Sequence, residues 1–287
     1  MNDHIARLRA RLAAPRRLLT VPGCWDGLGA LLIEQAGFEA AFLTGGGLAM
    51  ARLGRPDVGL VTMSELADAV AVIRDRVALP LIVDGDTGFG GALNMARTVR
   101  VLERAGASAV QIEDQAFPKR CGHMAGKRVV PLAEAVGRVH AALDACGDML
   151  VIARTDALAV EGLASAMDRA EAFLAAGADL IFIEGPRDIA EMTRIAETFA
   201  ARVPLVHNLV EGGISPTHAG DDLERMGFAV ALHPLLLMHG LAQAAPGWLA
   251  HLRARRTTAG LPLATLADMN RMTGAADLLA AGARYDV

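Results

Sequence analysis

The sequence is poor in aromatic residues and in cysteine. Phe, Trp and Tyr together make up 4% of its 287 residues, and only three cysteines occur, Cys24, Cys121 and Cys146. None of them belongs to a CxxC pair, so their spacing favours neither a zinc site nor a disulfide framework. A reduced, cytoplasmic setting follows most simply. Hydrophobic residues nevertheless reach 53%, which is enough for a sizeable core built of aliphatic side chains.

Excess charge and targeting signals are also lacking. The formal net charge is −4 and the isoelectric point about 6.1, so the chain has no basic footprint for nucleic acid. The first fifteen residues alternate Arg with Leu, Ile and Ala. Because they contain no continuous apolar segment, they do not predict a signal peptide.

One long stretch, Met226–Leu252, contains no Asp, Glu, Lys or Arg and is long enough to suggest a membrane span. Pro234, Gly240 and Pro246 interrupt it, and three histidines lie within it. We therefore expect a buried strand followed by a helix that packs against another subunit, and no membrane contact.

Short apolar runs alternate with alanine- and leucine-rich helical stretches along most of the chain. Eight such alternations predict a (β/α)₈ barrel whose parallel strands are buried on both faces. The expected strands are 18–22, 40–43, 79–83, 109–112, 149–153, 180–183, 204–207 and 228–232. The expected helices are 27–36, 64–76, 93–105, 132–145, 163–176, 188–200, 221–226 and 235–252. Gly106-Ala107 and Gly177-Ala178 are typical of helix C-caps.

A single domain over residues 1–287 is expected, because no linker, charge block or low-complexity segment interrupts the chain. It comprises an N-terminal helix at 1–15, the barrel at 16–256 and a helical extension at 257–287, with helices near 263–272 and 275–281. The competing fold is a doubly wound open sheet. The glycines between Gly85 and Gly91 argue against it, because they follow the third strand instead of opening a first βαβ unit.

Carboxylates follow two neighbouring expected strands. Asp84 and Asp86 come at the end of the third, and Glu113 and Asp114 at the end of the fourth. The C-terminal ends of barrel strands form the active site, and four acids with no nearby base repel one another there. A hard cation relieves that repulsion, so the sequence predicts a Mg²⁺ site, with Mn²⁺ as a substitute. Asp84 and Asp86 are expected to point into the barrel together from one side of the strand.

Other strand ends add further polar groups. Thr44-Gly45-Gly46-Gly47 follows the second strand, and its backbone N–H groups can approach an anionic carboxylate. Arg154 ends the fifth strand, where it either pairs with Glu113 or Glu184 or clamps a substrate carboxylate. The remaining candidates are Glu184 on the sixth strand, Asn208 with Glu211 on the seventh and His233 on the eighth, where a structural histidine is equally expected. Asp114 and Asp156 are as well explained as helix caps.

Cys121 lies in the polar segment Lys119-Arg120-Cys121-Gly122-His123. Its cationic neighbours are expected to lower the pKa of the thiol. The surrounding loop, 115–130, is longer than an ordinary βα connection and is predicted to act as a lid. The alternative is a small buried hydrophobe, which is the interpretation given to Cys24 and Cys146.

These segments resemble the isocitrate lyase / phosphoenolpyruvate mutase superfamily. Lys119 to His123 resembles the signature loop of its carbon–carbon lyase branch, and the similarity continues through Thr44–Gly47, Arg55–Asp57, Ala153–Ala157, Glu184 and Asn208. It covers about Val21 to Pro234. Two departures concern the pocket wall, since Gln111 stands where methylisocitrate-cleaving members carry His, and His233 where Tyr is common. The Glu211-Gly212-Gly213 turn is closer to members that act on alkylmalates.

The resemblance implies Mg²⁺-dependent cleavage of the C2–C3 bond of a 2-hydroxy di- or tricarboxylate, of the 2-alkylmalate or 2-methylisocitrate type. The products are pyruvate or glyoxylate and a second carboxylic acid. Alternatives are oxaloacetate decarboxylation, phosphonate P–C bond chemistry and, from another class, a non-catalytic carboxylate-binding barrel. A homotetramer built as a dimer of dimers, with a late helix swapped between subunits, is also implied.

Individual roles follow from the same resemblance. Catalysis is assigned to Cys121, as the acid that protonates C3, with Glu113, Arg154 and His123; Glu113, Glu184 and His123 remain open as acceptors of the hydroxyl proton. The metal ligands are Asp84, Asp86 and Glu113. The substrate-binding residues are Thr44, Gly45, Gly46, Asp57, Gly122, His123, Arg154, Glu184, Asn208 and His233.

Overall fold

The computed structural model describes residues 3–14, 17–214, 216 and 219–285. The chain divides into two compact units, Met1–Met238 and His239–Val287. The division lies ahead of the 256/257 boundary expected from the sequence, and the number of domains stays a prediction.

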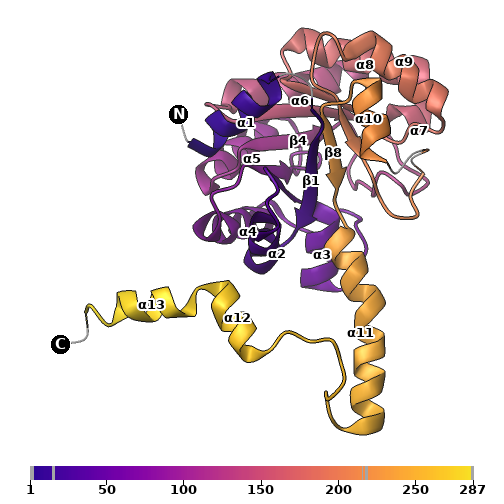
Figure 1. Cartoon of the computed structure of the whole chain (residues 1–287). Coiled ribbons are helices and arrows are strands. Elements are labelled where there is room, and N and C mark those ends of the chain that lie inside the picture. Colours follow the sequence, from indigo (N-terminus) through magenta and orange to yellow (C-terminus); the bar gives the residue numbers. More distant parts are fainter. Residues whose placement is uncertain (1–2, 15–16, 215, 217–218, 286–287) are drawn as a thin grey trace. The chain divides into compact units, whose positions relative to one another are not determined.

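Eight parallel strands form the centre of the first unit (Figure 1). They are β1 (Leu19–Cys24), β2 (Ala41–Leu43), β3 (Leu81–Asp84), β4 (Ala109–Glu113), β5 (Leu150–Thr155), β6 (Leu180–Ile183), β7 (Val206–Asn208) and β8 (Val230–His233). Each strand from β1 to β5 pairs with the next in sequence, β8 pairs with both β1 and β7, and a bridge between Ile181 and Leu205 connects β6 to the segment before β7. The predicted (β/α)₈ barrel is therefore confirmed.

Nearly every strand residue is buried, and only Thr20 and His233 are partly exposed. Strands covered on both faces read as continuous apolar runs instead of alternating ones, which explains why the sequence indicated them so clearly.

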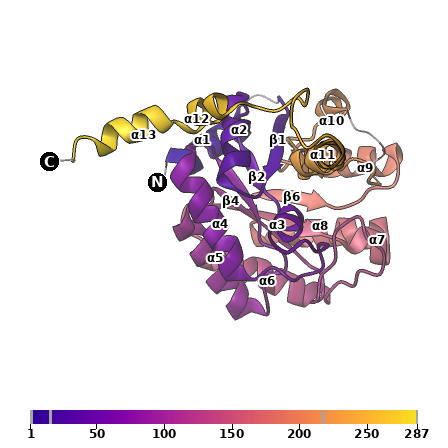
Figure 2. The ribbon, with the colours of Figure 1, turned by 90° about the horizontal axis from the view of Figure 1, so that it is seen from below.

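Helices surround the strands (Figure 2). In the first unit they are α1 (Asp3–Ala13), α2 (Gly27–Gln35), α3 (Gly45–Leu53), α4 (Met63–Arg76), α5 (Ala92–Ala105), α6 (Leu132–Ala145), α7 (Ala157–Glu161), α8 (Leu163–Ala176), α9 (Ile189–Phe199) and α10 (Gly220–Met226). The expected C-caps are confirmed at Gly106 (φ 109°) and Gly177 (φ 105°), because a left-handed backbone is readily adopted by glycine.

Helix α1 lies against the N-terminal ends of the strands. The Arg7 guanidinium donates to the carbonyl of Ala78 ahead of β3, and the Arg9 guanidinium donates to that of Asp148 ahead of β5. The side chains of Ile5 and Leu8, on α1 itself, are fully buried. This helix therefore covers one end of the barrel and leaves the C-terminal ends of the strands for a site.

Two helices, α3 and α7, were not expected from the sequence. Helix α3 begins directly after β2 with Thr44 as its N-cap, whose hydroxyl accepts from the N–H of Gly47 at 3.2 Å. Three successive glycines disfavour a helix by propensity. The cap and the buried position of Leu48 and Ala49 outweigh that preference.

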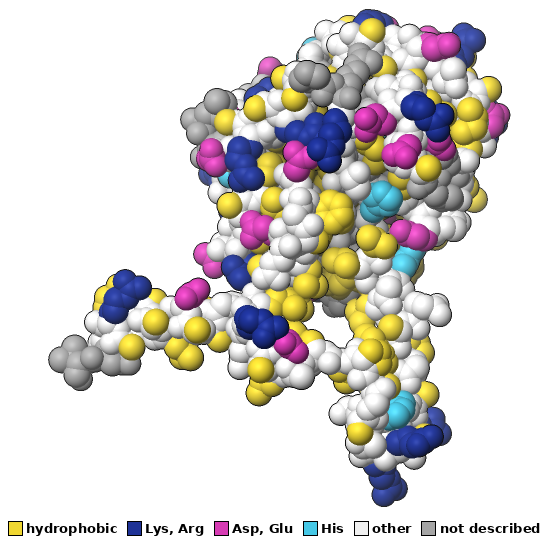
Figure 3. Space-filling model, in the orientation of Figure 1, with side chains coloured by type: hydrophobic (Ala, Val, Ile, Leu, Met, Phe, Trp, Pro, Cys, Tyr) yellow, Lys and Arg dark blue, Asp and Glu magenta, His cyan; other side chains and the backbone are white. Residues whose placement is uncertain are grey.

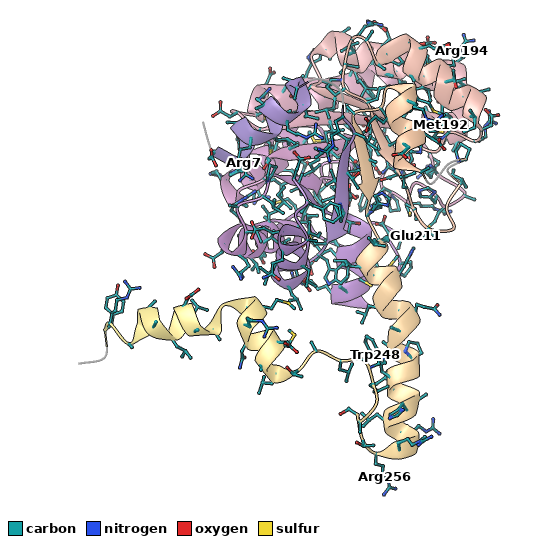
Figure 4. All side chains as sticks on the ribbon, in the orientation of Figure 1. Arg7, Met192, Arg194, Glu211, Trp248 and Arg256 are labelled. Atoms are coloured by element: carbon teal, nitrogen blue, oxygen red, sulfur yellow. The ribbon has the colours of Figure 1, made fainter. Side chains whose placement is uncertain are left out.

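The second unit continues α11 (Leu236–Arg255) and contains α12 (Leu266–Thr273) and α13 (Ala275–Gly282). No residue of these three helices, all of which the structure describes, is buried. Hydrophobic side chains are visible along their surfaces in Figure 3, and Figure 4 shows Trp248 on α11 with Arg256 beyond its end. Among the described residues, no helix has the length and apolar character needed to cross a membrane.

Candidate active site

A small cavity of about 50 Å³ lies at the C-terminal ends of the strands, beneath the loop 115–130. The sequence-predicted residues that line it are Thr44, Gly46, Asp57, Asp84, Glu113, Cys121, Gly122, His123, Arg154 and Asn208. Gly45, Asp86 and Glu184 contact this lining from behind. The structure does not bring His233 here, because it lines a separate pocket with Leu209, Glu211 and Gly212.

Asp84 and Asp86 are both buried, but strand alternation does not bring them together. Strand β3 ends at Asp84, and Asp86 follows in a left-handed turn with φ of 49°. A Cβ placed on Gly45 would lie 3.2 Å from Asp84 Oδ2 and 3.5 Å from Asp86 Oδ1. The turn therefore brings both carboxylates against the start of α3, where a Cβ at position 45 would crowd Asp84.

Lys119 supplies the base that the sequence analysis did not expect beside these acids. Its Nζ lies 2.5 Å from Asp57 Oδ1 and 2.6 Å from Asp86 Oδ1, and its side chain is 4% exposed. The expectation that the acids lack a nearby base is therefore wrong. The sequence suggested Lys119 only as a neighbour of the cysteine, since nothing in its spacing indicates which acids it contacts.

Arg154 is held by three carboxylates. Its Nε lies 3.3 Å from Glu113 Oε2 and 2.9 Å from Asp156 Oδ2, and its Nη1 lies 3.2 Å from Glu184 Oε2. Asn208 donates to the same oxygen of Glu184 at 2.8 Å. The ion-pair interpretation of Arg154 therefore holds in the structure, and its role toward substrate stays a prediction.

Burial disfavours the ionised form of two of the acids, Asp86 and Glu113. It raises the pKa of Asp86 to about 7, against the opposing effect of Lys119, and Asp84 raises it further. Burial likewise raises the pKa of Glu113 well above its usual range, although Arg154 opposes this. Glu113 Oε1 has no hydrogen-bond partner among the residues that the structure describes. A further cation at this position would stabilise both carboxylates.

The pKa of the Cys121 thiol is shifted in the opposite direction to the one expected from the sequence. Burial raises the pKa of this thiol, and this outweighs the backbone hydrogen bond from His123, which lowers it. Lys119 is turned away toward Asp57 and Asp86. The expectation of a lowered pKa is therefore wrong, and at neutral pH Cys121 is a protonated thiol, the form that can donate a proton.

His123 is neutral with a defined tautomer. Its Nδ1 accepts a hydrogen bond from the backbone N–H of Ile214 at 3.2 Å, so its proton is on Nε2, which faces Glu184 Oε1 at 3.8 Å. Burial lowers the pKa of the ring, with an opposing effect of Glu184. His123 therefore fastens the loop to the segment after β7.

The loop 115–130 is held together by contacts within it. Gln115 and Val129 form an antiparallel bridge at its base, and the Gln115 side chain makes two hydrogen bonds with the Arg120 backbone. Its buried cation Lys127, which the sequence analysis did not single out, donates to the Gly122 carbonyl and to Asp156.

Asp114 and Asp156 have structural partners. Asp114 accepts from the Thr155 hydroxyl at 2.6 Å and from the Asp156 N–H at 2.9 Å, and it contacts Arg169 at 3.2 Å. Asp156 precedes α7 without making a side-chain cap. The capping alternative is therefore wrong for Asp156, which pairs with Arg154 and Lys127.

The oxygen ligands at the site are of the chemical type that binds a divalent cation. The site contains more acidic than basic side chains. Its three cations are Lys119, Lys127 and Arg154, and its six carboxylates are those of Asp57, Asp84, Asp86, Glu113, Asp156 and Glu184. Within the described residues, however, no group of three His, Cys, Asp or Glu is already arranged around one metal position. Asp86 contacts Lys119 through Oδ1.

The fold and the site define a (β/α)₈-barrel protein whose carboxylate-rich cavity is covered by a cysteine-bearing loop. A family profile described as phosphoenolpyruvate phosphomutase matches residues 8–248. The chain belongs to the phosphoenolpyruvate mutase / isocitrate lyase superfamily. The resemblance expected from the sequence is thus confirmed.

Two curated relatives are lyases. The chain is 38% identical over 273 residues to 2,3-dimethylmalate lyase of Eubacterium barkeri, covering 94% of this chain and 93% of the relative. It is 42% identical over 238 residues to 2-methylisocitrate lyase of Bacillus subtilis (strain 168), covering 83% and 78%. These relatives support the expected carbon–carbon lyase class.

Solved structures agree with the fold. The crystal structure of 2,3-dimethylmalate lyase has a TM-score of 0.94 and 32% identity, covering 99% of this chain and 96% of that one. A structure of phosphonopyruvate hydrolase in complex with oxalate and Mg²⁺ has a TM-score of 0.88 and 30% identity, covering 98% and 99%. A divalent metal is therefore found in a member of this superfamily.

Proposed function

We propose that the protein is a Mg²⁺-dependent carbon–carbon lyase, with Mn²⁺ as a substitute, that cleaves the C2–C3 bond of a 2-hydroxy di- or tricarboxylate. The products are pyruvate or glyoxylate and a second carboxylic acid. The observation that carries this proposal is Cys121, a partly buried protonated thiol on a loop that covers an acid-lined cavity. A thiol in this position is suited to protonate a carbanion at C3.

Asp84, Asp86 and Glu113 are the proposed metal-binding residues, because they are buried carboxylates next to the cavity. When bound, the cation supplies Lewis-acid polarisation of the substrate's C1 carboxylate and C2 oxygen. The raised pKa values of Asp86 and Glu113 support this, since such acids gain stability from an adjacent cation.

The C2 hydroxyl has to lose its proton, and Glu113 is the proposed acceptor, in the ionised form that Arg154 and a bound cation would favour against the effect of burial. His123 already has a proton on Nε2, and both Arg154 and Asn208 contact Glu184. Of the two glutamates, Glu113 has a buried carboxylate oxygen without a hydrogen-bond partner in the described part of the chain, and Glu184 does not.

As the bond breaks, charge develops on the carboxylate next to C3. In the first turn of α3 the N–H of Gly45 donates to Asp84 and that of Gly47 to Thr44, so Gly46, which lines the cavity, offers its backbone N–H at a helix N-terminus, a position that favours anions. Arg154 and Asn208 line the opposite part of the cavity. We propose that these groups bind the two substrate carboxylates and stabilise the developing charge.

Several apolar side chains in the lining favour an alkyl-substituted substrate. Phe42, Met50, Val210 and Leu235 border the same cavity. They provide contacts for a methyl or larger alkyl group, so a 2-alkylmalate is the preferred proposal and a 2-methylisocitrate the second.

A panel of 2-hydroxy acids tests the proposed reaction. The protein is incubated with Mg²⁺ and each acid, and lactate dehydrogenase with NADH detects the 2-oxo acid formed. Alkylmalates are expected to be cleaved and unsubstituted malate to react poorly. Absence of cleavage throughout a panel that includes 2,3-dimethylmalate and 2-methylisocitrate would overturn the proposed function.

The protein is also proposed to form a homo-oligomer, a tetramer in the preferred form. Leu266, Leu278 and Leu279 on α12 and α13 are 77%, 71% and 75% exposed, and exposed apolar side chains that lie close together are typical of a surface that a partner covers. Light scattering at micromolar concentration should give a multiple of 30.0 kDa. A mass equal to one chain would contradict this prediction.

A further inference from the structure

Lys127 is a buried cation that the proposed chemistry does not use. Its side chain is 2% exposed, and it is absent from the lining of the cavity. Its Nζ lies 2.5 Å from the carbonyl oxygen of Gly122 and 2.8 Å from Asp156 Oδ1. Burying a lysine is unfavourable unless its charge is compensated, so these two contacts determine where the ammonium group lies.

Asp156 connects this lysine to the floor of the site. The guanidinium of Arg154 binds Asp156 with two hydrogen bonds, Nε to Oδ2 at 2.9 Å and Nη2 to Oδ1 at 3.1 Å. Burial raises the pKa of Asp156, but Arg154 and Lys127 outweigh it and bring the pKa down to about 2. One permanently ionised carboxylate therefore holds both a barrel arginine and a loop lysine.

The backbone at Gly122 lies directly on the Arg154–Glu184 pair. A Cβ added to Gly122 would lie 2.4 Å from Arg154 Nη2 and 2.8 Å from the Glu184 side chain. Cys121 and His123 flank this glycine. The position of its peptide group therefore determines where the thiol and the imidazole lie relative to the cavity.

We propose that Lys127 is a positioning residue that fastens the Gly122 carbonyl to Asp156 and so holds Cys121 and His123 over the site. The catalytic part of this inference depends on the proposed function, but the placement of Cys121 does not. The loop residues Cys121, Gly122 and His123 line the cavity, so the position of the loop determines the shape of that side of the site. Lys127 holds the loop in this position.

The loop offers a matched control at the next position. Arg128 is also cationic but exposed. Lys127→Met removes the charge and keeps a flexible side chain of similar length, whereas Arg128→Met removes an exposed charge from the same loop. Lys127→Arg keeps the charge and tests rescue.

The first readout is kinetic. Lys127→Met is expected to lower kcat about 100-fold, the effect of displacing a catalytic group by about 1 Å, with a smaller change in KM. Lys127→Arg should recover part of kcat, and Arg128→Met should resemble the unchanged enzyme. A structural role alone would lower thermal stability without separating kcat from KM.

The second readout needs no activity. Iodoacetamide labelling of Cys121, followed by mass spectrometry of its peptide, should be about tenfold faster in Lys127→Met than in the unchanged protein or Arg128→Met. Labelling at Cys24, which is fully buried, reports global unfolding in the same sample. If Lys127→Met does not fold, Lys127→Gln carries the same test.

The outcomes separate the two proposals. Faster Cys121 labelling without any lyase activity in the unchanged protein would leave the loop attachment standing and overturn the proposed function. Unchanged labelling of Cys121 together with unchanged kcat in Lys127→Met would overturn the positioning role of Lys127.

Discussion

Replacing Cys121 with serine is expected to lower kcat by about two to four orders of magnitude, the usual contribution of a general acid. The reason is the acidity of the donor, because a serine hydroxyl is far less acidic than a thiol and cannot deliver a proton to C3 at a comparable rate. Binding of the metal and of the carboxylic acid product should change little, since their proposed contacts come from other strands. The measurement is steady-state turnover of the best 2-hydroxy acid.

Cys146→Ser is the matched control for loss of a thiol. Cys146 Sγ donates to the Met149 carbonyl outside the site, and a serine hydroxyl can retain that hydrogen bond. Its kcat should equal that of the unchanged enzyme. If Cys121→Ser retained full turnover on every acid cleaved, the general-acid role would be excluded.

The pH profile gives an independent check on the same residue. Burial raises the pKa of Cys121, so the thiol keeps its proton at neutral pH, and activity that needs this proton falls only as pH rises above the ordinary thiol value of about 8.5. A decline with its midpoint near pH 6 or 7 would point to a thiolate instead. The cysteine-dependent alkaline decline should be absent from the residual activity of Cys121→Ser.

The strands could be predicted from the sequence because burial on both faces gives them an unmistakable apolar pattern. Expected and observed bounds agree within two residues at each end, and helices α6 and α8 agree at both ends. Helix α3 was missed because Gly45, Gly46 and Gly47 have poor helix propensity, and its cap at Thr44 depends on the strand that precedes it.

Which residues form the site was easier to predict from the sequence than which groups those residues contact. Residues at strand ends converge in any barrel, so Asp84, Glu113, Arg154 and Asn208 could be brought together from the fold alone. The contacts made by a loop are not fixed by strand order. The sequence therefore gave no sign that Lys119 reaches Asp86, that Lys127 reaches Asp156 or that burial controls the Cys121 thiol.

His233 illustrates a second limit. It was expected in the site because it ends β8, yet it lines another pocket with Glu211. A strand end fixes which end of the barrel a residue occupies, but the direction of its side chain depends on the pleat and the following turn. The role of His233 toward substrate stays a prediction that the geometry does not support.

Removing the metal, or Asp86, is expected to have the other large effect. EDTA should abolish turnover, and Mg²⁺ or Mn²⁺ should restore it. Asp86→Ala should raise the activation free energy by several kcal/mol, roughly what Lewis-acid assistance contributes. Full turnover in metal-free enzyme would rule out the proposed mechanism.

Asp86 is the informative position because it faces two possible cations. In the structure its carboxylate contacts Lys119, which also holds Asp57 at 2.5 Å. Asp86→Ala leaves Lys119 paired with Asp57, so the fold should be retained and circular dichroism should be unchanged. Asp75→Ala on α4 removes an exposed carboxylate and should leave both activity and metal binding intact. Calorimetric titration with Mn²⁺ separates the two functions of Asp86: weakened Mn²⁺ binding identifies a metal ligand, whereas unchanged Mn²⁺ binding with lost activity would restrict Asp86 to holding Lys119.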